Sequence, residues 1–157
     1  MMPDATELKK DFSLGRLNVT TTLGDKDNDG DYDEIYSFCA RSFTVWNGYS
    51  GKQIYDSGNE LEQKTIEAGK YDDGRSDDKG AEPEGITLGY VGKRVIAFVG
   101  MERADAVALY DVTNPYNPSF IKISGTGDAP DGLLFISAKD SPTGKSLLVV
   151  SSENDGR

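Results

Sequence analysis

Residues 85–124 read GITLGYVGKRVIAFVGMERADAVALYDVTNPYNPSFIKIS, in which apolar runs alternate with short segments rich in Gly, Asp, Asn and Pro. The apolar runs are Ile86–Val91, Val95–Met101, Val107–Val112 and Phe120–Ser124. Short runs of this kind, separated by turn residues, are typical of antiparallel strands joined in chain order. The stretch therefore predicts one four-stranded antiparallel meander.

Further strands are expected on both sides of this meander. They are Arg16–Thr21, Glu34–Ala40, Ser42–Asn47 and Lys52–Asp56 before it, and Leu133–Ser137 and Leu147–Ser152 after it. The turn Asn47–Gly51 has hairpin chemistry. Residues 1–15 are expected to form a flexible N-terminal segment. Residues 57–84 are expected to form a long polar loop, in which a capping-box pattern at Asn59 predicts a short helix over Glu60–Ala68.

A weak internal repeat suggests how these strands are organised. Glu82–Ile86 parallels Ala129–Leu133 at an offset of 47, and Phe98–Arg103 parallels Val149–Asn154 at an offset of 51. A four-stranded unit that recurs near this period is typical of a propeller blade, although coincidence between two β-rich stretches stays open. About ten strands make about two and a half blades, fewer than a closed propeller needs.

We therefore expect an all-β fold, a partial β-propeller over residues 16–157 built from four-stranded blade-like antiparallel meanders. Its open sheet edges are expected to meet the remaining blades of a longer parent protein, or another copy of the chain.

Composition narrows the possible functions. The chain of 157 residues has 17 Lys and Arg against 27 Asp and Glu, a net charge of −10, which disfavours nucleic acid and anionic membranes as partners. No stretch approaches the ~18 apolar residues of a membrane span, so membrane insertion is not expected. His is absent, which excludes Ser–His–Asp and Cys–His mechanisms for this chain by itself. The single cysteine, Cys39, is interpreted as a core residue.

The segment Asp25–Asp33 reads DKDNDGDYD and is predicted to hold a calcium ion. Its candidate ligands alternate along the loop and are Asp25, Asp27, Asp29, Asp31 and Asp33, with Gly30 permitting a sharp turn. An EF-hand would place Glu at the twelfth position, where Tyr36 stands, and the flanking segments have strand rather than helix patterns. We therefore interpret the loop as a structural clasp between strands. An unfilled acidic turn is the alternative.

A second group of charged residues is a weaker candidate, either for catalysis or for a second cation site. The candidates are Asp77, Asp78, Glu82, Glu84, Arg41 and Arg103. The two arginines each follow an apolar run and could face a shared cleft. For the acidic residues, the alternative is a solvated acidic loop, which we favour. For the arginines, the alternative is an ordinary ion pair, for example with Glu102.

Several runs together resemble one protein family. They are Leu14–Thr20, Gly24–Asp33, Ala40–Trp46, Arg75–Gly85, Phe98–Arg103, Tyr110–Pro115 and Asp131–Ile136. The set resembles the bacterial choice-of-anchor I proteins, which are exported and β-propeller-like, and corresponds to a late portion of the family's domain. The resemblance implies an extracellular or cell-surface location, with the anchor outside this chain, and some members carry an alkaline phosphatase label.

Two functions are consistent with these observations. The first is a non-catalytic, calcium-stabilised propeller segment used for scaffolding or recognition. The second is part of a metal-dependent phosphatase or other phosphoester hydrolase, in which metal-activated water and arginine replace histidine chemistry. The fragment itself is expected to be inactive under either hypothesis.

Overall fold

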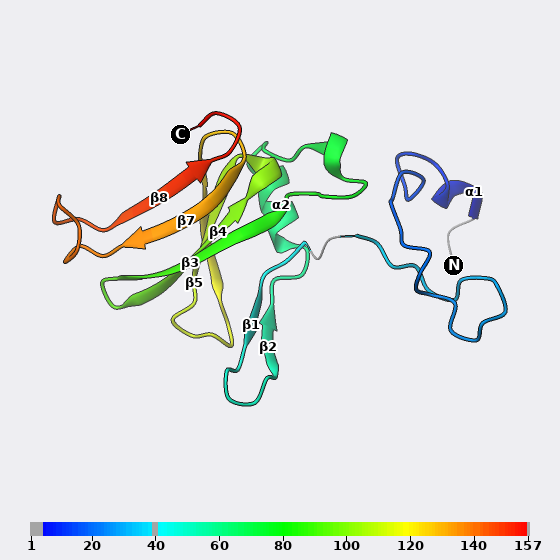
Figure 1. Ribbon diagram of the computed structural model, residues 1–157, viewed down its shortest axis with the longest axis horizontal. Helices are drawn as coiled ribbons and strands as arrows, with labels where there is room; N and C mark the ends of the chain where they lie inside the picture. The colour runs from blue at the N-terminus through cyan, green and yellow to red at the C-terminus, as the bar shows by residue number, and fades with distance from the viewer. Residues whose placement is uncertain (1–4, 39–40, 157) are drawn as a thin grey trace.

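The computed structural model describes residues 5–38 and 41–156, which form three antiparallel sheets and few helices (Figure 1). The strands are β1 (Thr44–Trp46), β2 (Gln53–Asp56), β3 (Pro83–Val91), β4 (Arg94–Met101), β5 (Ala106–Asp111), β6 (Ser119–Gly125), β7 (Pro130–Ile136) and β8 (Leu147–Ser152). The helices are α1 (Ala5–Leu8) and α2 (Glu60–Glu67), with 3-10 turns η1 (Asp73–Arg75) and η2 (Glu102–Ala104). The fold is therefore all-β, as predicted.

The predicted meander is confirmed as the central sheet, in the order β3-β4-β5-β6. Gly92, with φ 64°, turns the chain between β3 and β4, in the left-handed region that glycine adopts without strain. Two shorter hairpins flank this sheet, β1-β2 and β7-β8. The sheets do not close into a ring within the described residues.

Each face of the central sheet packs against a different element. On one face Phe98 stacks on Phe135 of β7, with ring centroids 5.7 Å apart. On the other face Tyr110 is fully buried and meets Phe43 at 4.8 Å between ring centroids, beside the buried Leu61 of α2. Two apolar clusters of buried side chains thus sandwich β4 and β5.

The internal repeat has a structural counterpart. Glu82 and Ala129 immediately precede β3 and β7, and both have left-handed backbones, with φ of 51° and 54°. The carbonyl of Glu82 accepts a hydrogen bond from the backbone N–H of Glu102, and that of Ala129 accepts one from Glu153, each at 2.9 Å. Both hairpins also have a register shift just after their first proline. The β7-β8 hairpin therefore repeats β3-β4, which argues against coincidence.

The predicted strands Arg16–Thr21 and Glu34–Ala40 do not form over the described residues. Their described parts share one isolated antiparallel bridge, between Val19 and Ser37. This N-terminal part, blue in Figure 1, lies at one end of the molecule, away from the sheets. A two-stranded ribbon without a hydrophobic surface to pack on is marginally stable, which accounts for the missing strands. Residues 39 and 40, including Cys39, lie outside the described residues.

The predicted helix in the polar region 57–84 is confirmed as α2. The predicted capping box does not form, because the Asn59 side chain makes no cap hydrogen bond. Leu61 and Thr65 face the core from this helix. The hairpin turn at 47–51 is also confirmed, with the Gly51 N–H donating to the Asn47 carbonyl at 2.8 Å.

Candidate metal centre

The acidic loop is closed at its base by backbone hydrogen bonds. The carbonyl of Gly24 accepts from the N–H groups of Asp33 at 2.9 Å and Glu34 at 3.2 Å. A Cβ on Gly24 would lie 2.2 Å from the carbonyl oxygen of Glu34, and its φ is 111°, so only glycine fits this closure. The sequence therefore brings the two ends of the acidic run together through local chemistry.

Three of the five predicted ligands converge inside this loop. Carboxylate oxygens of Asp25, Asp27 and Asp33 lie within 4.8 Å of one another. Asp25 Oδ2 accepts from the Gly30 N–H at 3.2 Å, and Asp33 Oδ2 accepts from the Lys26 N–H at 3.0 Å. These bonds fix one oxygen of each of the two carboxylates.

The other oxygen of Asp25 has no partner. Asp25 Oδ1 is buried and makes no hydrogen bond. A buried acceptor without a partner costs about 1–3 kcal/mol, so such atoms are rare unless an ion or water satisfies them. Hard carboxylate oxygens grouped in this way are the ligands that calcium prefers.

The other two predicted ligands lie outside this group. Asp29 Oδ1 accepts a hydrogen bond from the Asp31 N–H at 3.0 Å, which shapes the turn. The first, third and ninth positions of the loop therefore supply the converging carboxylates. The side chain at the fifth position, Asp29, instead accepts a hydrogen bond from the backbone.

A small cleft adjoins the loop. It has a volume of about 230 Å³, and its lining includes Asp25, Asn28 and Tyr32. The Tyr32 hydroxyl donates to the carbonyl of Thr21 at 3.2 Å and holds the aromatic ring against the loop. Hydrogen bonds from Lys26 and Tyr36 keep the pKa of the Glu34 carboxyl below its usual value.

A second carboxylate group lies where β3 and β4 meet. Oxygens of Glu82, Glu84 and Glu102 lie within 4.8 Å of one another, and Glu82 and Glu102 are buried. Arg103 bridges two of them, with Nε 2.9 Å from Glu82 and Nη2 2.8 Å from Glu102. Lys79 also pairs with Glu82. Two cations thus offset much of the charge of three carboxylates.

The pKa values of the two buried glutamates shift in opposite directions. Burial by itself raises the pKa of Glu82, but Lys79 and Arg103 outweigh it and hold that pKa below its usual value. Burial also raises the pKa of Glu102, and there the nearby Glu82 and Glu84 charges add to the effect, so Arg103 does not compensate. The group is therefore an ion-pair network in which the cations compensate the charge of Glu82 more fully than that of Glu102.

The remaining predicted catalytic residues do not join this network. Arg41 pairs with Glu62 at 3.2 Å and donates to the carbonyl of Ser76 at 2.6 Å. Asp77 contacts Asn18 instead, and Asp78 Oδ1 is buried without a hydrogen-bond partner. The two arginines have separate sets of partners, Glu62 and Ser76 for Arg41 and Glu82 and Glu102 for Arg103. Glu102 was identified in the sequence only as an ion-pair partner, which it is.

Residues 1–115 match the choice-of-anchor I domain, which is most of the chain. The chain belongs to the choice-of-anchor I family. It is also similar to Gigasin-3a from Magallana gigas, with 31% identity over 183 residues that cover 95% of this chain and 64% of that protein. The chain thus spans slightly less than two thirds of that relative's length. No solved structure matches it.

Membership of the choice-of-anchor I family indicates an exported or surface-anchored bacterial protein. Within residues 5–38 and 41–156 no helix is long and apolar enough to cross a bilayer. The match includes the whole acidic loop and the start of the central sheet, so the candidate metal centre lies inside the family's domain.

Proposed function

We propose that this chain is a calcium-stabilised segment of a β-propeller in an exported or surface-anchored protein, with a scaffolding or recognition role. The observation that carries the proposal is the convergence of Asp25, Asp27 and Asp33, together with the buried and unpartnered Oδ1 of Asp25. A bound cation would satisfy that oxygen and offset the repulsion among the three carboxylates.

Calcium fits this loop better than magnesium. Calcium accepts six to eight oxygens in flexible geometry, so backbone carbonyls and water can complete a shell that three carboxylates begin. Magnesium needs near-ideal octahedral geometry and keeps its water, which suits a crowded carboxylate group poorly.

The propeller assignment is supported by the repeated hairpin geometry. A four-stranded antiparallel meander followed by a second hairpin with the same entry and exit is the arrangement of successive blades. The remaining blades would come from the rest of the parent protein or from another copy. In this arrangement the calcium loop is a structural clasp and not a catalytic centre.

Terbium binding tests the metal site, because Tyr32 belongs to the loop, lines the same small cleft as Asp25 and can sensitise terbium luminescence. The wild-type chain should give sensitised emission that calcium displaces. Asp25→Asn should lose it, whereas Asp31→Asn, outside the converging group, should keep it. Absence of emission from the wild type, or equal emission from Asp25→Asn, would contradict the proposal.

A phosphoester hydrolase is the second candidate, favoured by the grouping of Glu82 and Glu84 with Arg103. Carboxylates that bind a metal ion and an arginine that stabilises developing charge can act on phosphoesters without histidine. The test is turnover of a generic phosphoester by the full-length parent with calcium. Loss of turnover in Glu84→Gln would support this candidate, and absence of turnover in the wild type would reject it.

A further inference from the structure

The two repeated hairpins, β3-β4 and β7-β8, point in the same direction. A Cβ on Gly85 would lie 2.6 Å from the carbonyl oxygen of Asp131, and one on Gly89 would lie 2.5 Å from the ring of Phe135. These contacts follow the same order along both strands, so β3 and β7 run parallel to each other. The connections β3–β4 and β7–β8 therefore lie together at one end of the sheets, the turn end (Figure 1). The start of β3 and β7 and the end of β4 and β8 form the opposite, open end.

The turn end is basic. Its exposed cations come from both connections and are Lys93, Arg94, Lys139 and Lys145. Lys93, Lys139 and Lys145 make no ion pair with any described residue, and Arg94 lies 3.8 Å from Asp111. The other carboxylate here, Asp140, accepts a hydrogen bond from the Ser137 hydroxyl at 2.6 Å. This end therefore has a net positive charge in a chain whose net charge is −10.

The open end is acidic. Its exposed carboxylates again come from both hairpins and include Glu84, Asp128, Asp131 and Glu153. Asp128, Asp131 and Glu153 form no ion pair within residues 5–38 and 41–156. The cations of this end have other partners, because Arg103 and Lys79 pair with the buried Glu82 and Lys70 donates to the carbonyl of Asp105 at 3.3 Å. The internal repeat thus preserves the charge of each end.

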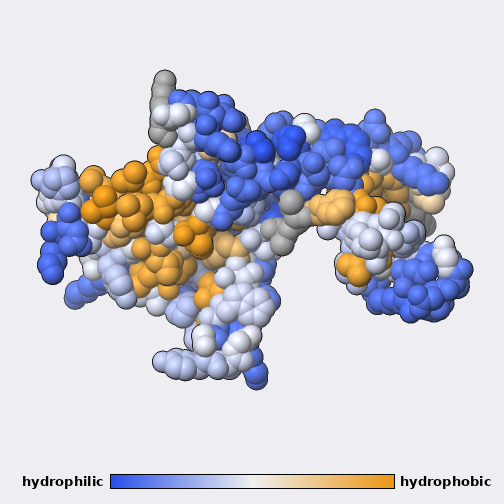
Figure 2. All heavy atoms as spheres, viewed as in Figure 1, coloured by the Kyte–Doolittle hydropathy of each residue, from blue (hydrophilic) through white to orange (hydrophobic). Residues whose placement is uncertain are grey.

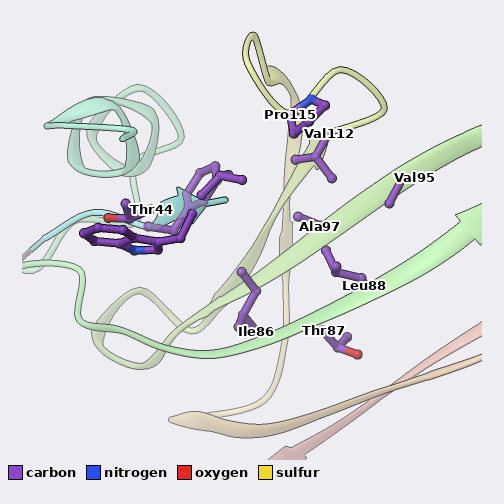
Figure 3. A pocket seen from close by; sticks show the side chains of 11 residues that line it. Thr44, Ile86, Thr87, Leu88, Val95, Ala97, Val112 and Pro115 are labelled. Atoms are coloured by element: carbon purple, nitrogen blue, oxygen red, sulfur yellow. The ribbon is translucent and has the colours of Figure 1, made fainter. Parts of the chain in front are cut away.

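The surface between the two ends is apolar. Figure 2 shows hydrophobic side chains gathered over the sheets, and Figure 3 shows the cleft between β1 and the central sheet, with Ile86, Leu88 and Ala97 in its lining. None of the residues that line this cleft is charged. The nine residues of β3 separate the ends by about 27 Å. Salt at physiological strength screens charges beyond about 8 Å, so each end presents its own charge to a partner.

We propose that copies of this chain associate end to end, with the turn end of one copy on the open end of the next. Lys93, Lys139 and Lys145 of one copy then face the carboxylates of the open end, which gives electrostatic complementarity across the contact. The net charge of −10 opposes association at long range, but screening leaves the two facing ends to decide the outcome.

The contact uses two different surfaces, so each copy keeps one free end of each kind and the association can continue into a linear assembly. The inference rests on the scaffolding role proposed above and gives that role a partner, a second copy of the chain. It does not depend on calcium in the acidic loop.

Sedimentation velocity of the full chain in excess chelator tests the proposal. The average mass of the wild type should rise with protein concentration at low salt and fall back to that of one chain as salt is added. Replacing Lys93, Lys139 and Lys145 with Gln removes the charge of the turn end and should leave only monomer. The matched control replaces Lys9, Lys10 and Lys52 with Gln, three exposed cations outside both ends, and should associate as the wild type does.

The open end is tested by the variant Asp128→Asn, Asp131→Ser and Glu153→Gln, which should also be monomeric. A mixture of the turn-end and open-end variants should form dimers and stop there, because each partner keeps one functional end. Circular dichroism checks that every variant is folded.

Three results would overturn the proposal. They are a wild type that stays monomeric at every protein concentration, association that does not weaken with salt, and a mixture of the two variants that stays monomeric. Replacing Asp27, Asp29 and Asp31 with Ser should not change association, and its loss would mean that the acidic loop occupies the turn end instead. Because chelator is present throughout, failure here leaves the calcium site untouched, and failure of terbium binding leaves end-to-end association untouched.

Discussion

Glu82 and Glu102 share Arg103 but affect stability with opposite signs. The pKa of Glu82 is lowered in the folded chain, so its contribution is present above its unfolded pKa and is lost as pH falls through the folded value. The pKa of Glu102 is raised, so its contribution is fully present below its unfolded pKa and is lost as pH rises through the folded value.

Glu82→Gln should therefore destabilise the protein at neutral pH, by about 1–3 kcal/mol, because it removes the partner of Lys79 and Arg103. Glu102→Gln is the matched control and should cost less, because it removes a poorly compensated charge. Denaturant unfolding at neutral pH measures both. A larger loss in Glu102→Gln than in Glu82→Gln would contradict these pKa directions.

The residues of the metal centre differ in how far the sequence alone predicts them. Asp25, Asp27 and Asp33 are predictable because their convergence depends on local spacing and on the turn at Gly30. The sequence does not predict that Asp29 lies outside this group, because that depends on the hydrogen bond that its side chain accepts from the Asp31 N–H. Glu102 joins Glu82 only through the pairing of β4 with β3, which is a tertiary contact across 20 positions of sequence.

At the scale of elements, strands with apolar runs and a packing surface were predicted well, as in β3 to β8. Over the described residues, the strand predictions for Arg16–Thr21 and Glu34–Ala40 failed, because a two-stranded ribbon without a hydrophobic surface to pack on is marginally stable. The contact between β3 and β7 shows how closely elements approach once such a surface exists. A Cβ on Gly89 would lie 2.5 Å from ring atoms of Phe135.

Gly89→Ala should therefore destabilise the protein by about 1–3 kcal/mol, because the added methyl group forces β7 away from β3. Gly48→Ala is the control, because a Cβ there meets nothing within 4 Å and the position is in an exposed turn. Thermal unfolding of the two variants measures the difference. Equal melting temperatures would show that β7 does not pack on β3 as described.

At the scale of the whole molecule, the chain combines one four-stranded meander, one repeated hairpin and an acidic loop in an N-terminal part that has one isolated β-bridge over its described residues. The all-β class follows from the punctuated apolar runs of residues 85–124. The number of propeller blades cannot be inferred from these apolar runs, because it depends on strands other than those of the three sheets. Calcium would act at this scale by fixing the acidic loop of the N-terminal part.

Thermal unfolding of the full chain in excess calcium and in excess chelator tests the central claim most directly. Ligand that binds only the folded state at about 100 times its dissociation constant stabilises by about 2.7 kcal/mol, which corresponds to a rise of about 5–10 °C for a chain of this size. We predict that rise for the wild type and for Asp31→Asn, and its loss in Asp25→Asn. Coincident melting curves of the wild type with calcium and with chelator would contradict a structural calcium site.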